Sequence, residues 1–245
     1  MALACLKLAR HAQRNPSVVG YLVAVTIQGV AISSANDALQ KGAVSKEVRD
    51  ALEAELAIQE PMDSFVWALK SERAFVVDSS RNIAPLRNFW LITRGFWNMH
   101  ASACLDDFPA FIELASHPGP YRDVEQTIQG KKSPLAVLLF PALKTAYMAT
   151  TRMRAEIRCL RVLIALQTHV RAGSNEVPKL SELGLPAEAT TDPFTGEPLH
   201  VNKTPQGWLV YSVGPNLRDD GGKLDNPYNG DVGVGPPPAE KPAKK

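Results

Sequence analysis

The chain has 245 residues, of which 45% are hydrophobic and 21% charged, so it can bury a sizeable core and lacks the composition of a disordered protein. Its formal net charge of +2 is too small to indicate a nucleic-acid partner. The three cysteines, Cys5, Cys104 and Cys159, lie far apart without a zinc spacing, and their odd number excludes a fully paired disulfide framework. Buried free thiols are expected, with an intermolecular bridge or a redox role as the alternative.

The first residues carry no clear export or membrane signal. The longest apolar run, Val18 to Ile32, has about 15 residues, fewer than the roughly 18 that a membrane span requires. A signal peptide begins with basic residues, and the stretch from Met1 to Leu6 has none, although its Ala-Leu-Ala-Cys is faintly similar to a lipoprotein processing site. We expect a periplasmic or cell-envelope protein whose export signal is missing, with a cytoplasmic protein as the alternative.

The first 172 residues show helical periodicity and predict antiparallel helices joined by short loops. A helix of about 24 residues is expected after Asn15, its predicted N-cap, with Pro16 in the first turn and Gly42 at the end. Ser45 is expected to cap the next helix, and Pro61 to open a third. The residues expected to face the core on these two helices are Val44, Val48, Leu52, Leu56, Phe65, Val66, Leu69 and Phe75.

Aromatic residues concentrate between residues 82 and 130, where Asp107 is the predicted cap of a short helix that reaches Leu114. Core packing is the expected role of this cluster, and a ligand or peptide groove is the alternative. The cluster consists of Phe89, Trp90, Phe96, Trp97, Phe108 and Phe111.

A long helix is predicted from Ser133-Pro134 to Val170, with a kink or early break at Pro141. Its expected apolar face consists of Met153, Ile157, Leu160 and Ile164. Beside that face lies a basic stripe of Arg154, Arg158 and Arg161, which predicts a solvated or salt-bridged surface, or alternatively contact with anionic lipid or nucleic acid.

After Gly173 the pattern changes. One helical turn is expected between Lys179 and Gly184. Two alternating segments, 199–203 and 207–213, flank Pro205-Gln206-Gly207 and predict a β-hairpin. The last ten residues, 236–245, hold four prolines and three lysines, which predicts a disordered tail.

Acidic residues and glycines follow the hairpin. Four aspartates fall within residues 214–231, and carboxylate and carbonyl oxygens are the ligands that Ca²⁺ prefers. The spacing does not match an EF-hand loop and lacks its closing Glu, so the residues alone leave a calcium site and an ordinary solvated loop both open.

The order of motifs in residues 134–235 resembles the C-terminal half of the major pseudopilin of type II secretion. A long helix leads into Asp192-Pro193-Phe194-Thr195-Gly196-Glu197-Pro198-Leu199, then Tyr211-Ser212-Val213-Gly214 and a loop with Asp219-Asp220-Gly221-Gly222. The form of these motifs, together with residues 69–74, is also similar to uncharacterised envelope-associated proteins of planctomycete-type bacteria. The pilin start is absent, and the long helix is not N-terminal, so filament assembly is not expected.

The resemblance implies a structural calcium ion in the loop and a small antiparallel sheet packed on the long helix. Its candidate metal ligands are Leu217, through its carbonyl, and Asp219, Asp220, Asp225 and Asp231. No cofactor other than Ca²⁺ and no catalytic residue is expected, since the five histidines form no metal spacing and no nucleophile elbow or P-loop occurs.

We therefore expect an α+β protein with a mostly helical body (1–132), a long helix plus pseudopilin-like β module (133–235) and a tail (236–245). The expected function is that of a non-catalytic, envelope-associated structural or interaction protein with an unidentified protein partner and membrane association through a missing N-terminal anchor. The alternatives are binding to an anionic surface, lipid or nucleic acid, through the Arg-rich helix, and an enzyme with an unrecognised site in the helical body.

Overall fold

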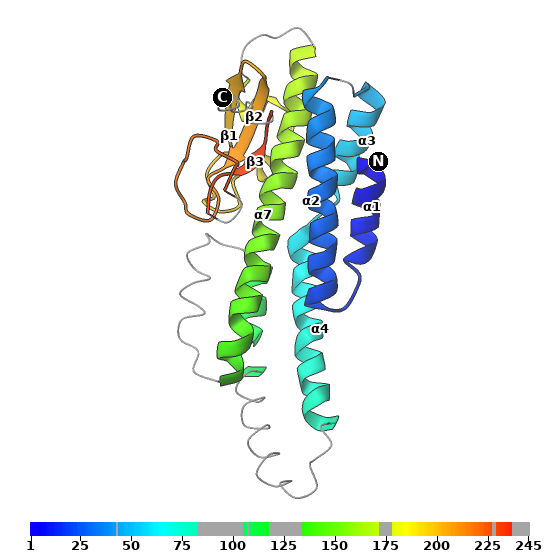
Figure 1. Ribbon diagram of the computed structural model, residues 1–245, viewed down its shortest axis with the longest axis vertical. Helices are drawn as coiled ribbons and strands as arrows, with labels where there is room; N and C mark the ends of the chain where they lie inside the picture. Colours follow the sequence, from blue (N-terminus) through cyan, green and yellow to red (C-terminus); the bar gives the residue numbers. More distant parts are fainter. Residues whose placement is uncertain are drawn as a thin grey trace, which may run out of the picture. The chain divides into compact units, whose positions relative to one another are not determined.

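The computed structural model describes residues 1–42, 44–82, 105–106, 108–117, 134–171, 178–226 and 229–236 (Figure 1). It confirms the α+β class, with long helices followed by a small antiparallel sheet. The helices are α1 (Ala2–Ala12), α2 (Val18–Gln40), α3 (Lys46–Ala57), α4 (Pro61–Asn82) and α7 (Pro134–Arg171), and residues 108–116 are also helical. Two short 3-10 helices, η1 (Leu180–Glu182) and η2 (Ala187–Thr190), precede strands β1 (His200–Thr204), β2 (Gly207–Ser212) and β3 (Val232–Val234).

Contacts divide the chain into two compact units, each built from separate segments. Unit 1 comprises Met1–Lys7, Ile27–Gln59 and Ala155–Lys245, and unit 2 comprises Leu8–Thr26 and Glu60–Arg154. The division falls within α1, α2 and α7, and also in the loop between α3 and α4. The boundary expected near residue 132 lies outside the described residues, so the division proposed from sequence stays a prediction.

The first two helices differ from expectation at their beginnings. Helix α1 was not predicted as a separate element. Helix α2 starts at Val18, and the cap is Ser17, whose hydroxyl accepts a hydrogen bond from the Gly20 amide at 3.0 Å, so the expectation that Asn15 is the N-cap is wrong. The Asn15 side chain instead accepts from the Ser17 hydroxyl at 2.9 Å. Gly42 has φ +69 just beyond α2, as a helix-ending glycine requires.

Helices α3 and α4 start where the capping residues predict. Ser45 accepts a hydrogen bond from the Val48 amide at 3.4 Å, and Pro61 is the first residue of α4. Burial corrects the predicted core face at two positions. Val48 is 48% exposed and Phe75 is 66% exposed, because a regular apolar spacing fixes a shared face but not whether a neighbour covers all of it.

The core of unit 2 is an aromatic cluster of Tyr21, Phe65, Phe111 and Tyr147, all buried. Ring centroids lie 5.4 Å apart for Tyr21 and Phe65, and 6.3 Å apart for Phe65 and Phe111. Phe108 is also buried, so the part of the predicted aromatic cluster that is described does pack in the core. The other members, Phe89, Trp90, Phe96 and Trp97, and the predicted cap Asp107, lie outside the described residues.

The Tyr21 hydroxyl forms two hydrogen bonds within this core. The hydroxyl donates to the Pro61 carbonyl at 3.1 Å and bonds to the Thr150 hydroxyl at 2.9 Å. Burial is the main reason that its pKa rises far above the usual value. A buried phenol with two partners is satisfied and needs no functional explanation.

Helix α7 continues through Pro141, so the early break expected there does not occur. The residue expected to cap it, Ser133, lies outside the described residues. Its predicted apolar face is confirmed, since Met153, Ile157, Leu160 and Ile164 are all at most 4% exposed. Of this face, Ile157, Leu160 and Ile164 lie in unit 1 together with the β module.

The sheet has the order β1-β2-β3, with both pairings antiparallel. The predicted hairpin is confirmed, with Thr204 opposite Gly207 across the turn Pro205-Gln206. Strand β3, which was not predicted from alternation, pairs Val234 with Val210 and Val232 with Ser212. The predicted packing on the last long helix is confirmed by Cys159 of α7, whose thiol lies 3.8 Å from the Val232 carbonyl in the same unit.

Helix α2 corrects the expectation that no segment is long enough to cross a membrane. Among the described residues it is one helix of 23 residues that is long and apolar enough by length and composition, although the core helix of a soluble protein meets the same criterion. The apolar run was counted only to Ile32, whereas the helix continues to Gln40 through mostly small residues and one charged residue, Asp37.

Candidate functional site

The Asp-Pro-Phe-Thr-Gly turn is organised by the Asp192 carboxylate, which is 1% exposed. Its Oδ1 accepts from the Phe194 amide at 2.8 Å and from the Ser212 hydroxyl at 2.7 Å, and its Oδ2 accepts from the Val213 amide at 3.0 Å. A buried carboxylate is tolerated when several donors satisfy it. Asp192 therefore ties the turn to the end of β2.

The same turn is closed locally by its backbone. The Asp192 amide donates to the Glu197 carbonyl at 2.7 Å, and the Gly196 amide donates to the Asp192 carbonyl at 2.8 Å. Gly196 has φ +79, a conformation that residues with a Cβ rarely adopt. The turn brings Phe194 into the core of unit 1, where its side chain is fully buried.

A second buried carboxylate, Asp231, organises the acidic loop and is 2% exposed. It accepts from the Gly222 amide at 2.7 Å and from the Asp220 amide at 3.3 Å. Burial is the main reason that the pKa of Asp231 is raised, and the charges of Asp220 and Asp219 raise it further. The negative charges of Asp219 and Asp220 therefore oppose the ionisation of Asp231 within the loop.

Asp219 connects this loop to the outer face of the hairpin. Its Oδ1 accepts from the Tyr211 hydroxyl at 3.1 Å and from the Gly221 amide at 2.8 Å, and its Oδ2 lies 3.7 Å from His200 Nδ1. The Gly221 amide is the main reason that the pKa of Asp219 is lowered. The His200 ring stacks on Tyr211, its cross-strand partner, with centroids 5.0 Å apart. Burial and then Asp219 raise the pKa of Tyr211 to about 12.

The candidate metal ligands are partly brought together. Asp219, Asp220 and Asp231 share the hydrogen-bonded loop, and Asp220 also accepts from the Asn216 side chain at 2.8 Å. Leu217 has φ 57, an unusual left-handed backbone for a leucine, which marks a sharp bend in the loop. Asp225 is exposed and takes part in none of these hydrogen bonds.

Carboxylate oxygens are ligands that a hard cation prefers, but the arrangement of these carboxylates matches a cation site only in part. Most of the carboxylate oxygens named above accept from amide or hydroxyl donors, which hold the loop in place. Within the described ranges, no group of three or more His, Cys, Asp or Glu side chains is arranged to hold a metal ion. Calcium binding therefore stays a prediction.

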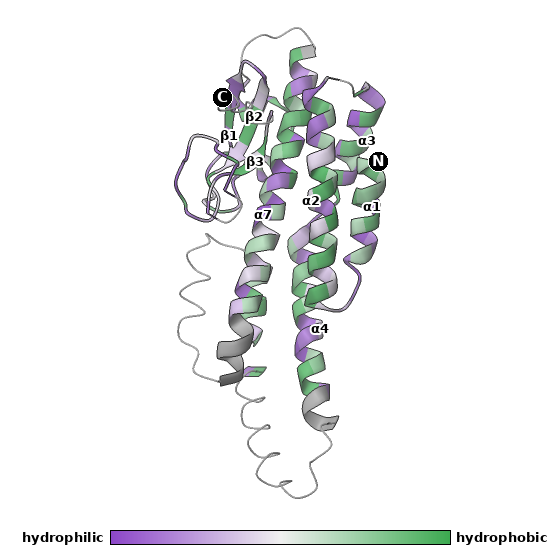
Figure 2. Ribbon diagram, viewed as in Figure 1, coloured by the Kyte–Doolittle hydropathy of each residue, from purple (hydrophilic) through white to green (hydrophobic). Residues whose placement is uncertain are grey.

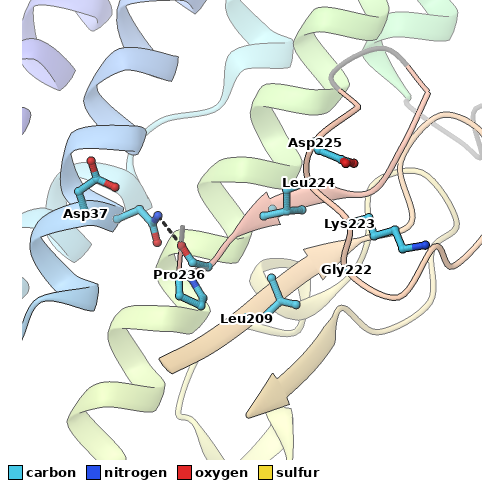
Figure 3. Close-up of a pocket in the computed structure, with 10 residues that line it drawn as sticks. Asp37, Leu209, Gly222, Lys223, Leu224, Asp225 and Pro236 are labelled. Carbon is cyan, nitrogen blue, oxygen red and sulfur yellow. Dashed lines mark hydrogen bonds between the residues drawn. The ribbon is translucent and has the colours of Figure 1, made fainter. Parts of the chain in front are cut away.

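A cavity of about 420 Å³ lies in unit 1 beside the same loop (Figure 3). Leu209, Leu224 and Pro236 give it an apolar lining, while Asp37 and Asp225 place two carboxylates along it. Asn36 of α2 donates to the Gly235 carbonyl at 2.8 Å, and Gln40 donates to the Trp208 carbonyl at 2.9 Å. Sequence reasoning did not identify this contact between α2 and the sheet.

The basic stripe of α7 is engaged within the protein. Arg154 pairs with Glu60 at 2.9 Å, Arg158 donates to the Thr191 carbonyl at 2.8 Å, and Arg161 pairs with Glu53 at 2.7 Å. The side chains of Arg154 and Arg161 are 10% and 13% exposed. These contacts match the salt-bridged interpretation of the stripe and leave little of it exposed to an anionic surface.

The sequence analysis did not predict two side-chain contacts of the module. Ser212 and Asp192 are 20 residues apart, and His200 and Asp219 are 19 apart, so no local spacing links them. The signal that did exist was the hairpin register, which places His200 opposite Tyr211.

Comparison with known proteins does not assign the chain to a family. No protein-family model matches the chain, and neither the curated proteins nor the solved structures give a match. The resemblance to the major pseudopilin stays a prediction that rests on the quoted motifs.

Proposed function

We propose that the chain is a non-catalytic structural or interaction protein of the cell envelope, whose C-terminal β module presents an acidic loop for ion-dependent stabilisation. The observation that carries this proposal is the pair of buried carboxylates. Asp192 and Asp231 use their oxygens to accept hydrogen bonds from the turn and loop that follow the long helix. Groups used in this way hold a shape rather than move protons.

The acidic loop supports the ion in this proposal through its electrostatics. Asp219 and Asp220 both disfavour the ionised form of Asp231. The folded loop therefore keeps these carboxylates near one another despite the repulsion between their charges. A divalent cation that bridges these acids would remove this repulsion and stabilise the folded module by mass action. Leu217 and Asp225 are the further ligands that the resemblance assigns, and Ca²⁺ is the ion that fits hard oxygen donors.

Thermal unfolding of the chelator-treated protein tests this function. We expect millimolar Ca²⁺ to raise the midpoint by several degrees and Mg²⁺ to have little effect, because Mg²⁺ requires a stricter octahedral geometry. An Asp219→Ala/Asp225→Ala variant should lose the Ca²⁺ response. A Glu188→Ala/Glu197→Ala variant is the matched control, since both of these acids are exposed in the same module and neither belongs to the loop.

An unchanged midpoint of the wild-type protein with Ca²⁺ would remove the ion from the proposal. A response that survives the loop variant would place the ion elsewhere. The alternative of anionic-surface binding through the Arg-rich helix has less support, since Arg154, Arg158 and Arg161 bind internal partners. The alternative of an enzyme would need an acid in the helical body such as Glu72. This carboxylate accepts from the Val18 amide at 2.9 Å and so stabilises the start of α2.

A further inference from the structure

Helix α2 is apolar on the face that packs in the core and also on the face that points outward. Tyr21, Ala24 and Val25 are buried on one side. On the other side Val19 is 72% exposed and Val23 is 53% exposed, four residues apart and therefore on one face of the helix. An outward helix face of a globular protein normally carries polar residues. Figure 2 shows hydrophobic residues along the visible side of this half of α2.

Helix α1 leads into this half of α2 and carries a similar exposed residue in the same unit, Leu8, which is 58% exposed. We call Val19 and Val23, which share one face of α2, the N-terminal patch. The exposed basic side chains of α1 and of the loop after it include Lys7 and Arg14. The first 36 residues of the chain contain Lys7, Arg10 and Arg14 but no Asp or Glu.

We infer that the α1–α2 segment, through the N-terminal patch, docks on the surface of an anionic lipid bilayer. Helices that lie on anionic membranes carry exposed apolar side chains beside Lys or Arg, and each cation near an anionic surface contributes about 1 kcal/mol. One acid, Glu72 of α4, contacts the start of α2, where it accepts from the Val18 amide. A second copy of this chain is a poorer occupant, because the first 36 residues carry cations and no acid of their own to pair with the same cations of a second copy. Nucleic acid is also poorer, since the patch holds no aromatic side chain on which bases stack.

The segment lies on the bilayer surface and does not cross the bilayer. The buried face of α2 is held by the Tyr21 hydroxyl, which bonds to Thr150 and to the Pro61 carbonyl. A helix that crossed the membrane would lose these partners. Surface docking leaves them intact and buries only the outward side chains to the depth of the headgroup region.

This inference names a surface for the envelope association in the proposed function and rests on that association. Its test is separate, because it measures lipid binding and not the ion dependence of unfolding. The full chain is sedimented with vesicles of phosphatidylcholine containing about a third phosphatidylserine, and with vesicles of phosphatidylcholine alone, at low and at high salt. We expect binding to the anionic vesicles only, and weaker binding at high salt.

The variant Val19→Ser/Val23→Ser should weaken vesicle binding about tenfold or more, because it removes apolar area that enters the bilayer. The matched control is Val48→Ser/Ile58→Ser, which changes two side chains of comparable exposure on and just after α3, among Glu47, Asp50 and Glu53. Arg14→Glu should also weaken binding to anionic vesicles. Circular dichroism checks that each variant keeps its helices.

Three results would overturn the inference. Failure of the wild-type chain to sediment with anionic vesicles would exclude docking on such a bilayer. Equal losses in the two serine variants would show that the N-terminal patch has no special role. Binding that resists high salt and is equal for neutral vesicles would indicate that α2 inserts across the bilayer instead.

Discussion

The β module of unit 1 and the aromatic core of unit 2 are stabilised by different interactions. In the module, two carboxylates satisfy amides and a hydroxyl that lie between 2 and 21 residues away. In unit 2, four aromatic rings pack together, and the Tyr21 hydroxyl reaches Thr150 across 129 residues of chain. The module should therefore respond to pH and ions, whereas the aromatic core should respond mainly to lost volume.

The largest effect is expected in the aromatic core. Phe65→Ala removes a fully buried ring that contacts Tyr21, Phe111 and Tyr147, and should lower the free energy of unfolding by about 3–5 kcal/mol. Phe75→Ala on the same helix is the control, and should change it by less than about 0.5 kcal/mol because Phe75 is exposed. Chemical denaturation measures both, and similar losses would mean that Phe65 does not hold a tight core.

A smaller loss is expected when the module loses its first carboxylate. Asp192→Ala leaves the Ser212 hydroxyl and the Phe194 and Val213 amides without their acceptor, which should cost about 2–3 kcal/mol. Glu197→Ala changes an exposed acid of the same turn and should have little effect. If Asp192→Ala unfolds at the same denaturant concentration as wild type, water replaces the carboxylate and the turn is not held by it.

The smallest effect concerns the pH dependence of the acidic loop, measured in chelator. Because the pKa of Asp231 is raised on folding, the folded state binds more protons than the unfolded state between the usual Asp value, near 4, and the raised value. Its contribution to stability is therefore present at low pH and is lost as pH rises through that window. The difference in stability between wild type and Asp231→Asn should fall with rising pH.

Asp219 supplies the control of opposite sign. Its pKa is lowered on folding, mainly by the Gly221 amide, so its contribution is present above the usual Asp value and is lost as pH falls through the lowered value. The difference between wild type and Asp219→Asn should therefore rise with pH. Denaturation at a series of pH values measures both differences, and two slopes of the same sign would contradict the electrostatic description of the loop.

Much of the local structure follows from short-range chemistry. The Ser45 cap, the start of α4 at Pro61 and the hairpin around Pro205-Gln206 were all predicted, because each depends on hydrogen bonds or backbone angles within a few residues. The cap of α2 was misassigned to Asn15 because Ser17 offers the same chemistry two residues later. Two nearby residues that can both cap a helix cannot be distinguished until the first residue of the helix is known.

The candidate site was predictable in composition but not in arrangement. The concentration of aspartates marked the loop, and Asp219, Asp220 and Asp231 do lie together in it. Their use as acceptors for backbone amides was not predictable, since it depends on how the glycines of the loop turn. Strand β3 was missed for a similar reason: three residues show no alternation, and only the pairing with β2 makes them a strand.

By itself, the sequence determined helices α2, α3, α4 and α7, the hairpin and the Ser45 cap of this protein, because these depend on periodicity and on hydrogen bonds between near neighbours. Only the tertiary structure decided that Val48 and Phe75 are exposed, that Arg154 and Arg161 are paired with Glu60 and Glu53, and that Asp192 holds the end of β2. The physical reason is that burial and ionic partners come from elements distant in sequence, and the spacing of residues along one element carries no record of them.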